Sequence, residues 1–574
     1  NRELGVFSNM TAQATSANMP VVLLKDGASQ TKGREAQKNN ISAAKIIAEI
    51  VRTSLGPRGM DKMLVDSLGD VTITNDGATI LKEIDVQHPA AKMLVEISKS
   101  TDNEVGDGTT SVVVLAGALL EQAESLILQD VHPTVIVDGY KKAGKKAKQY
   151  LKEIAEQVTA NDKPTLLKIA NTSMQTKLVR KESDMLADIV VQAVLAASVK
   201  DGENYTVDVD DIKVEKKTGG SISDSSILQG IVLDKEIVHS GMPKKVTNSK
   251  IALINTALEI EKTEIDAKIN ISTPDQMKSF LDEENKMLKT MVDKITNVGA
   301  TVVFCQKGID DMSQHYLTKA GILAVRRIKE SDLTKLAKAS GARIVTNLDD
   351  LSEKDLGTAG LVEERKVEED RWVFVEGCKH PKSVTILLRA GSQRVVDEVE
   401  RAVHDAIMVV KDVMELPSIV AGGGAPEVFA AAQITNWAKS LEGREQLAAE
   451  KFAEALETIP LALSENAGMD PIDTLATLRS RQLKGNKWTG IDVMKGQVSD
   501  LKSSNIVEPL VVKNQIISAA TEVACMILRI DDVIATAKSA GPPPGAEGGM
   551  PPGMGGMGGM PPGMGGMPDM GGMM

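Results

Sequence analysis

Gly106-Asp107-Gly108-Thr109-Thr110 runs directly into an apolar pattern of helical period over residues 111–128. Two glycines, one acid and two hydroxyls at this place predict a loop that opens a helix. The first turn of a helix leaves backbone N–H groups without intrahelical partners and carries the positive end of the helix dipole, which favours phosphate oxygens. Asp107 would repel these oxygens unless a cation lay between them. The stretch therefore predicts a nucleotide phosphate site, with Asp107 as a metal ligand.

The composition is that of a soluble globular protein with several domains. The chain has 574 residues, of which 42% are hydrophobic and 25% charged, and this length predicts two to four domains. A net charge of −12 and an aromatic content of 2% argue against nucleic-acid binding, which needs basic grooves and stacking platforms. No run of about 18 apolar residues predicts a membrane span, and no basic and apolar leader is visible. Cys305, Cys378 and Cys525 lie far apart, which favours reduced thiols in a cytoplasmic protein.

Helical patterns dominate both ends of the chain, and an α/β pattern fills its middle. Residues 1–40 are polar and irregular, and Asn40 is predicted to cap a first helix over residues 41–55. From about residue 230, short apolar runs alternate with helical or polar stretches; they are residues 231–233, 251–254, 301–304, 322–325, 372–375 and 383–388. A charged insert, residues 255–294, interrupts this pattern. The order predicts a helical domain built from both chain ends, with a second domain inserted into it.

The final segment, residues 541–574, consists of glycine, proline and methionine in short repeats and holds nine of the 26 methionines. Such a composition cannot form a packed core, so the segment is predicted to be disordered. It is either a plain linker or a flexible filler whose methionines contact unfolded chains.

Four segments, scattered in sequence, place glycines beside an acid or a hydroxyl at an element boundary. Besides residues 106–110 they are Leu55-Gly56-Pro57-Arg58-Gly59, Thr74-Asn75-Asp76-Gly77-Ala78-Thr79 and Gly422-Gly423-Gly424-Ala425. Each has a plainer interpretation when taken alone: a helix stop at residues 55–59, a type I′ hairpin turn at Asp76-Gly77, a capped helix start at residues 106–110, or a hinge at residues 422–425. Together they favour a nucleotide pocket, and the lack of a Gly-x-x-x-x-Gly-Lys-Ser/Thr sequence excludes an ordinary P-loop.

Hydrolysis of a bound nucleotide would also need a carboxylate that orients water. Asp397, Asp405 and Asp412 lie on one helical pattern. On physical grounds alone, such acids are most often solvated surface charges, so this pattern does not select a catalytic residue.

The four segments, in this order, resemble the group II chaperonins, which comprise the archaeal thermosome and the eukaryotic cytosolic chaperonin. The resemblance covers about residues 20–532. It also rests on Gln306-Lys307-Gly308-Ile309-Asp310-Asp311, Val403-His404-Asp405-Ala406 and Glu465-Asn466-Ala467-Gly468. The tail rich in glycine and methionine is similar to that of the archaeal branch.

The resemblance implies a multidomain fold with α/β and all-α parts. A mainly helical equatorial domain would comprise residues 1–160 and 422–540, and a discontinuous intermediate domain residues 161–230 and 387–421. The α/β apical domain would comprise residues 231–386. Within it, the insert at residues 255–294 would be the helical protrusion that serves as a built-in lid.

The resemblance also implies roles for individual residues. Leu55, Gly56 and Pro57 would lie against the phosphates and ribose, Asp107 would hold Mg²⁺, and Gly108, Thr109 and Thr110 would cradle phosphate oxygens. Gly423 and Gly424 would pass close to the ribose, Glu508 would bind its hydroxyls, and Asp492 would lie in the segment that lines the base. Asp76 and Asp405 would be the catalytic acids that position and activate water.

One loop departs from the family pattern. The usual Thr-Gly-Lys-Gly reads Met174-Gln175-Thr176-Lys177-Leu178 here. Lys177 keeps the cation that would sense the terminal phosphate, whereas both glycines are lost. The loop is therefore expected to be stiffer, which puts the strength of nucleotide sensing in doubt.

The function implied is that of an ATP-dependent chaperone with ATPase activity. ATP and Mg²⁺ would be its cofactors, with K⁺ as a further candidate cation, and hydrolysis would be coupled to lid closure over a non-native protein. Subunits would self-associate into two stacked rings, alone or with paralogous subunits, without nucleic acid or membrane. A helix at residues 333–339 is equally compatible with substrate binding and with core packing.

Two other classes of function stay open from the residues alone. An ATP-dependent ligase or kinase would need a further polar constellation for its substrate, and none is visible. An inert assembly with a vestigial nucleotide site is disfavoured by the presence of Asp76, Asp107 and Asp405.

Overall fold

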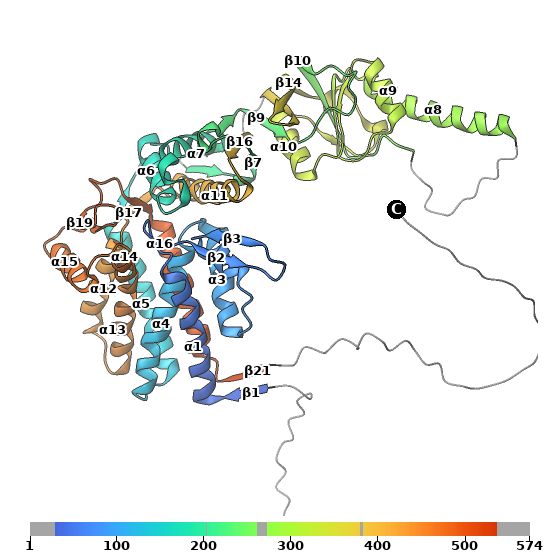
Figure 1. Ribbon diagram of the computed structural model, residues 1–574. Coiled ribbons are helices and arrows are strands. Elements are labelled where there is room, and N and C mark those ends of the chain that lie inside the picture. Colours follow the sequence, from blue (N-terminus) through green and yellow to red (C-terminus); the bar gives the residue numbers. More distant parts are fainter. Residues whose placement is uncertain (1–28, 203, 261–272, 379–382, 536–574) are drawn as a thin grey trace, which may run out of the picture. The chain divides into compact units, whose positions relative to one another are not determined.

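The computed structural model describes residues 29–202, 204–260, 273–378 and 383–535, which fall into two units. One unit comprises Asn1–Thr31 and Asp532–Met574. In it, strands β1 (Ser29–Lys32) and β21 (Asp532–Ala535) from the two chain ends pair with each other (Figure 1). The other unit, Lys32–Asp531, holds the remaining elements. The predicted disordered segment at residues 541–574 lies outside the described residues.

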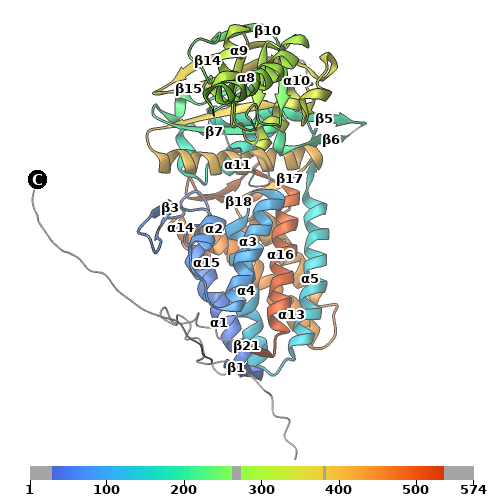
Figure 2. The same cartoon turned by 90° about the vertical axis from the view of Figure 1, so that its right-hand side faces the viewer.

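Long helices from both halves of the sequence pack side by side in what we call the helical body (Figures 1 and 2). The N-terminal half supplies α1 (Gly33–Arg52), α2 (Gly77–Glu83), α3 (Pro89–Val105), α4 (Thr109–Leu128) and α5 (Pro133–Ile154). The C-terminal half supplies α12 (Ala425–Ala438), α13 (Arg444–Leu456), α14 (Thr458–Asn466), α15 (Pro471–Leu483) and α16 (Leu510–Leu528). α4 contacts α1, α13 and α16, and α5 contacts α12, α13 and α16. Elements from both chain ends thus share one hydrophobic core.

Two helices of the body are more apolar than the sequence analysis anticipated. By length and composition alone, α4 and α16 could cross a membrane, with mean hydropathies of 1.6 and 1.3. The structure buries 61% of each of these segments inside the protein. Helices that are hydrophobic on every face are typical of a core, and the packing of α4 against α1 and α16 accounts for their composition.

The first helix begins earlier than predicted. α1 starts at Gly33, so residues 33–40, expected to be irregular, are helical, and Asn40 is buried inside the helix instead of capping it. The sequence of these residues is polar because only a narrow face of the helix is buried here. Ala36 and Asn40, four residues apart, face the core while the residues between them stay mostly exposed.

Three further helices form what we call the three-helix layer: α6 (Lys163–Met174), α7 (Ser183–Ala197) and α11 (Gln393–Glu415). They pack on one another, and α7 and α11 cover a sheet of β7 (Ile212–Thr218), β16 (Val384–Ala390) and β8 (Ser226–Leu228). β16 runs parallel to β7 and antiparallel to β8. The boundary expected at residue 386 falls inside β16. The strand predicted at residues 383–388 corresponds to β16 and therefore belongs to this sheet. The sequence did not reveal this pairing, because β7 and β8 lie far from β16 along the chain.

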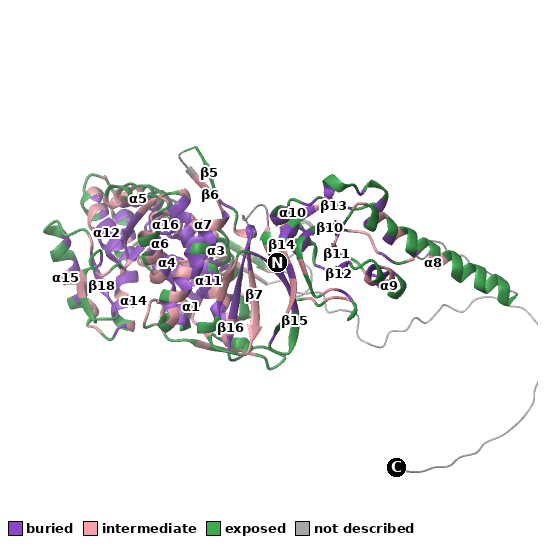
Figure 3. Cartoon of the chain, turned by 90° about the horizontal axis from the view of Figure 1, so that it is seen from above, coloured by how far each residue is buried: buried purple, intermediate pink, exposed green. Residues whose placement is uncertain are grey.

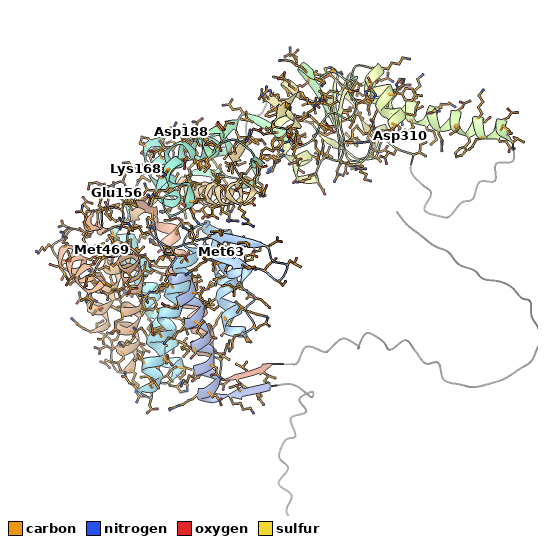
Figure 4. The ribbon with its side chains drawn as sticks, in the orientation of Figure 1. Met63, Glu156, Lys168, Asp188, Asp310 and Met469 are labelled. Atoms are coloured by element: carbon orange, nitrogen blue, oxygen red, sulfur yellow. The ribbon has the colours of Figure 1, made fainter. Side chains whose placement is uncertain are left out.

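The middle of the chain forms a seven-stranded mixed sheet in the order β12-β11-β10-β14-β15-β9, with β13 also paired to β10. Its strands are β9 (Gly230–Leu233), β10 (Lys245–Ile254), β11 (Val302–Cys305), β12 (Leu323–Val325), β13 (Ile344–Val345), β14 (Gly357–Val367) and β15 (Asp370–Cys378). Five of the predicted apolar runs fall in β9, β10, β11, β12 and β15. The sheet is accompanied by α8 (Pro274–Asn297), α9 (Asp311–Lys319) and α10 (Glu330–Ser340). Asp310 caps α9 by accepting a 2.8 Å hydrogen bond from the Met312 N–H (Figure 4).

The helix expected at residues 333–339 is α10, and its apolar face is part of the core. Leu333, Leu336 and Ala339 are all buried in a cluster under the seven-stranded sheet, so core packing accounts for their pattern. α8 behaves differently, because its first turns are exposed, whereas Leu288 and Val292 near its end are buried (Figure 3). The insert is thus helical from Pro274 onward, and residues 261–272 of it lie outside the described part of the chain.

Several short strands complete the chain: β4 (Glu156–Gln157), β5 (Ser198–Asp201), β6 (Asn204–Val207), β17 (Ser418–Ala421), β18 (Thr489–Asp492), β19 (Gln497–Asp500) and β20 (Val507–Pro509). The sheet β20-β17-β4 joins segments from both chain halves. β2 (Lys62–Val65) and β3 (Val71–Thr74) form a hairpin on which Met63 is exposed (Figure 4).

Candidate functional site

An open cleft with a cavity volume of about 140 Å³ is lined by residues of the helical body and the three-helix layer. Small molecules and cofactors typically bind in concave sites between packed elements of this kind. Twelve of the residues predicted from sequence line it: Leu55, Gly56, Pro57, Asp76, Asp107, Gly108, Thr109, Thr110, Lys177, Gly423, Gly424 and Glu508. The two other predicted residues, Asp405 and Asp492, do not line the cleft.

The loop at residues 106–110 has the geometry that its composition predicts. Gly106 follows the end of α3 and Gly108 precedes the start of α4, and both glycines have left-handed backbones with φ of 67° and 81°. A Cβ on Gly108 would also lie 2.6 Å from Ile516 Cδ1. Both the backbone conformation and the lack of space therefore require glycine at this position. Gly108 offers no side-chain cap to α4. The N–H groups of the first turn are therefore free to bind an anion in the cleft.

A second helix begins at the same cleft in the same way. α12 starts after Gly424, which has a φ of 74° and provides no side-chain cap. A Cβ on Gly423 would lie 2.5 Å from the Ile491 carbonyl oxygen, and one on Gly424 would lie 2.7 Å from Pro460 Cβ. The triple glycine thus lets two backbones approach closely and brings a second uncapped helix start to the cleft.

Asp76 is a helix cap and not part of a hairpin turn. The β2–β3 hairpin turns at residues 66–70, and β3 has already ended when Asp76 caps α2. Its Oδ2 accepts hydrogen bonds from the Thr79 N–H at 2.9 Å and the Thr79 hydroxyl at 2.8 Å, and its Oδ1 accepts one from the Thr109 hydroxyl at 3.0 Å. The hairpin interpretation of Asp76-Gly77 is therefore wrong. Gly77 is required because a Cβ there would lie 2.6 Å from Thr110 Oγ1.

Lys177 joins acids from two parts of the chain. Its Nζ lies 2.8 Å from Asp405 Oδ2 on α11 and 3.5 Å from Asp76 Oδ1, and its side chain is only 8% exposed. The loop that carries it is also tied to the helical body, because the Asn75 side chain donates a 2.7 Å hydrogen bond to the Thr176 carbonyl. Asp405 is therefore next to the cleft through Lys177, although it does not line it.

The charges of this cluster are strongly coupled. Burial raises the pKa of Asp405 well above its usual range; the positive charge of Lys177 opposes this, and the charges of Asp76 and Asp107 add to it. Burial would also raise the pKa of Asp76, but Lys177 and the hydrogen bonds from Thr79 and Thr109 outweigh it and lower that pKa to about 2. Burial lowers the pKa of Lys177, yet the neighbouring Asp405, Asp76 and Asp107 raise it above its ordinary value. Asp76 and Lys177 are therefore charged at neutral pH.

The site suits a divalent cation held together with phosphate. Three carboxylates, those of Asp76, Asp107 and Asp405, act on the single positive charge of Lys177, so negative charge is in excess. Within the described residues, no group of three or more His, Cys, Asp or Glu could hold a metal ion alone. Mg²⁺ usually binds through one or two carboxylates and completes its shell with substrate phosphates and water. Asp107, beside two uncapped helix starts, fits that arrangement.

The acids of α11 differ from their sequence-based interpretation as surface charges. Asp405 and Asp412 are buried on one face of the helix, seven residues apart, whereas Asp397 is partly exposed and pairs with Lys216 at 2.8 Å. Burial raises the pKa of Asp412 to about 8. The helix can come this close because Gly106 lacks a side chain; a Cβ there would lie 2.3 Å from Met408 Cβ.

Asp492 does not face the cleft. Its carboxylate is buried and accepts hydrogen bonds from the Lys495 N–H at 3.1 Å, the Lys495 ammonium at 2.9 Å and the Ser504 hydroxyl at 3.3 Å. Asp492 thus closes its own turn, while its neighbours Ile491 and Val493 line the cleft.

Sequence reasoning missed Lys513 and Glu427. Lys513 lines the cleft and pairs with both Glu508 and Glu427 in the core. A signal was present in the sequence, since Lys513 is a lone charge in the apolar helical run 510–521. Charged residues are almost never buried unless they are paired, but the spacing gives no indication of their partners.

Comparison with known proteins identifies the family of the chain. A family model described as the TCP-1/cpn60 chaperonin family matches residues 47–538, and the chain belongs to this family. It is 58% identical to the thermosome subunit alpha of Archaeoglobus fulgidus over 91% of this chain and 96% of that protein. It is 57% identical to a thermosome subunit of Methanopyrus kandleri, over 90% and 94% of the two chains. For the thermosome subunit beta of Thermococcus kodakarensis the identity is 55%, over 93% and 98%. The predicted membership of the group II chaperonins is confirmed.

Proposed function

We propose that the chain is a subunit of an ATP-dependent chaperone that encloses non-native proteins under a built-in lid. The observation that carries this proposal is the buried contact of Lys177 with Asp405 and Asp76. It joins the three-helix layer to the helical body at the edge of a cleft suited to phosphates. In domain terms, the helical body would be the equatorial domain, the three-helix layer with its sheet the intermediate domain, and the seven-stranded part the apical domain.

ATP would bind with its phosphates at the starts of α4 and α12. The free N–H groups of the first turn of α4, with the Thr109 and Thr110 hydroxyls, would bind phosphate oxygens, and Leu55, Gly56 and Pro57 would close the opposite wall. Asp107 would hold Mg²⁺, which would supply positive charge that offsets the charge of the phosphates. K⁺ is a further candidate, since the cluster has an excess of negative charge.

Asp405 and Asp76 would have different roles in hydrolysis. Asp76 stays ionised and is fixed by three hydrogen bonds, so it would orient the attacking water. Asp405, with its raised pKa, is the better proton acceptor and would take the proton of that water at its carboxylate. Lys177, between the two, would hold Asp405 in place and respond to the charge of the terminal phosphate.

Hydrolysis would be coupled to motion because its residues come from different parts of the chain. Lys177 and Asp405 belong to the three-helix layer, whereas Asp76 and Asp107 belong to the helical body. β16, which directly precedes α11, contacts β9 of the seven-stranded sheet, and the Thr385 hydroxyl accepts a 3.2 Å hydrogen bond from the Val232 N–H. A shift of α11 would therefore move the sheet that carries the insert.

The assembly and the substrates of the chain are part of this proposal. The thermosome relatives are named as subunits alpha and beta, which supports assembly from several subunits. The chain would form two stacked rings, alone or with paralogous subunits, in the cytoplasm. Non-native protein would contact exposed apolar side chains such as Met277, Phe280 and Leu281 on α8. α10 is a poor candidate because its apolar face is buried.

Release of phosphate from Mg²⁺-ATP by the purified chain, together with its particle size, tests this proposal. A megadalton-scale ring with slow ATP turnover supports it. A small oligomer that phosphorylates or ligates a small molecule would support a ligase or kinase, and a ring without turnover would support an inert assembly.

A further inference from the structure

Lys513 is a buried cation in the wall of the cleft that the proposed mechanism does not use. It lies on the apolar helix α16 and is 5% exposed. Its Nζ is 2.7 Å from Glu508 Oε2 on β20 and 2.9 Å from Glu427 Oε1 on α12. Burial lowers the pKa of Lys513, but the charges of Glu427 and Glu508 more than compensate and raise it above its ordinary value. A charged lysine thus connects three elements at the cleft.

The pairing of Lys513 with two glutamates argues against a role as a phosphate ligand. Of the described residues that line the cleft, Lys177 and Lys513 are the cationic ones. Lys513 already forms ion pairs with two carboxylates away from water. If its ammonium group moved to a phosphate, a buried carboxylate would lose its partner, which is strongly unfavourable. Its charge is therefore committed to Glu508 and Glu427.

The contacts of Lys513 fix one carboxylate of the cleft in a single orientation. Glu508 Oε2 is bound by Lys513, and Oε1 lies over Gly422, where a Cβ would be only 2.7 Å from it. The Glu508 side chain is 25% exposed and lines the cleft. A free glutamate side chain has several rotamers, and a group held in one of them binds its ligand without that entropic cost.

Glu427 is the buried anchor of this arrangement. It is 4% exposed, and its second oxygen, Oε2, has no hydrogen-bond partner among the described residues. Glu427 lies in the first turn of α12, three residues after Gly424. It does not line the cleft, so its contact with the site runs through Lys513.

We propose that Lys513, anchored by Glu427, is a positioning residue that holds Glu508 for the ribose hydroxyls and so sets the preference for ribonucleotides over deoxyribonucleotides. This inference rests on the proposed function, because it takes ATP as the occupant of the cleft, and on the ribose contact that the family resemblance implies for Glu508. A site built to hydrogen-bond a hydroxyl discriminates strongly against an analogue that lacks it, since its own polar group is then left unpaired.

Binding of ATP, 2′-deoxy-ATP and 3′-deoxy-ATP to the full-length purified protein tests the proposal by titration calorimetry with Mg²⁺. The wild type is expected to bind ATP about tenfold more tightly than at least one deoxy analogue, as loss of a charged hydrogen bond predicts. Lys513→Met is expected to bring this ratio close to one. The double variant Lys513→Met/Glu427→Met removes the buried charges together at similar volume, which protects the fold, and should lose the ratio equally.

Gln515→Met is the matched control. Gln515 lies two residues further along α16, is bonded to Glu104 and does not line the cleft, so the ratio should stay as in the wild type. An unchanged ratio in both Lys513 variants overturns the proposal, as does an equal loss of affinity for all three nucleotides. A wild type that binds ATP without discrimination overturns this inference alone. A wild type that binds no ATP overturns the proposed function as well.

Discussion

Asp405→Asn removes the carboxylate of α11 that we propose as the proton acceptor, while keeping the shape of its side chain. The amide oxygen can still accept from Lys177, whose Nζ lies 2.8 Å from the carboxylate in the wild type. Asparagine cannot take a proton from water. Loss of a positioned general base costs about 100- to 10,000-fold in rate, or about 3–5 kcal/mol in the barrier. ATP affinity should change by less than about threefold, or about 0.6 kcal/mol, because Asp405 does not line the cleft.

The assay is phosphate release at saturating Mg²⁺-ATP, with ATP binding measured separately on the same preparation. Asp397→Asn is the control, since Asp397 lies on the same helix but pairs at its surface with Lys216, and it should retain wild-type turnover. Because burial raises the pKa of Asp405, wild-type turnover should rise with pH as the carboxyl ionises, and this rise should be absent in Asp405→Asn. Near-wild-type phosphate release from Asp405→Asn would refute its role as the base.

Three other perturbations have defined outcomes. Gly108→Ala should weaken ATP binding by about tenfold, because the residue has a φ of 81° and its Cβ would meet Ile516. Gly321→Ala, at a φ of 71° in open space, is the control for backbone strain. Equal ATP binding by the two variants would contradict this prediction. In the folded protein, burial raises the pKa of Asp412 to about 8, so folding takes up a proton at pH values below this. Denaturant unfolding should therefore show that the free energy of unfolding falls by about 1.4 kcal/mol per pH unit between the ordinary pKa and that value. Asp412→Asn should remove this slope, and an unaltered slope would show that another group is responsible. Deleting residues 260–284 should spare ATPase activity and abolish protease protection of an enclosed substrate, while Leu288 and Val292 keep their core contacts; full protection would exclude a lid role.

Local chemistry made the loops of the cleft predictable. Glycines beside Asp107 and in residues 422–424 have few uses other than positive φ or close approach, and both uses occur. Asp76-Gly77 was ambiguous because the same dipeptide suits a hairpin turn and a helix cap. The neighbours decide between these, since β3 has already ended and Thr79 supplies the capped N–H.

Non-local packing could not be predicted in the same way. Helical period alone does not reveal which face of α11 is covered, so Asp405 and Asp412 could not be told from the partly exposed Asp397. The pairing of β16 with β7 and the contact of Lys177 with Asp405 join segments far apart in sequence. Such contacts follow from tertiary structure and leave no local periodicity.

We propose that the cleft at the first turns of α4 and α12 holds Mg²⁺-ATP within a ring that closes on hydrolysis. Electron cryomicroscopy of the full-length protein with Mg²⁺ and a non-hydrolysable ATP analogue tests it most directly. We expect two stacked rings, with nucleotide phosphates at the first turns of α4 and α12 and a cation at Asp107. A single small oligomer, or an analogue bound away from Asp107, would contradict it.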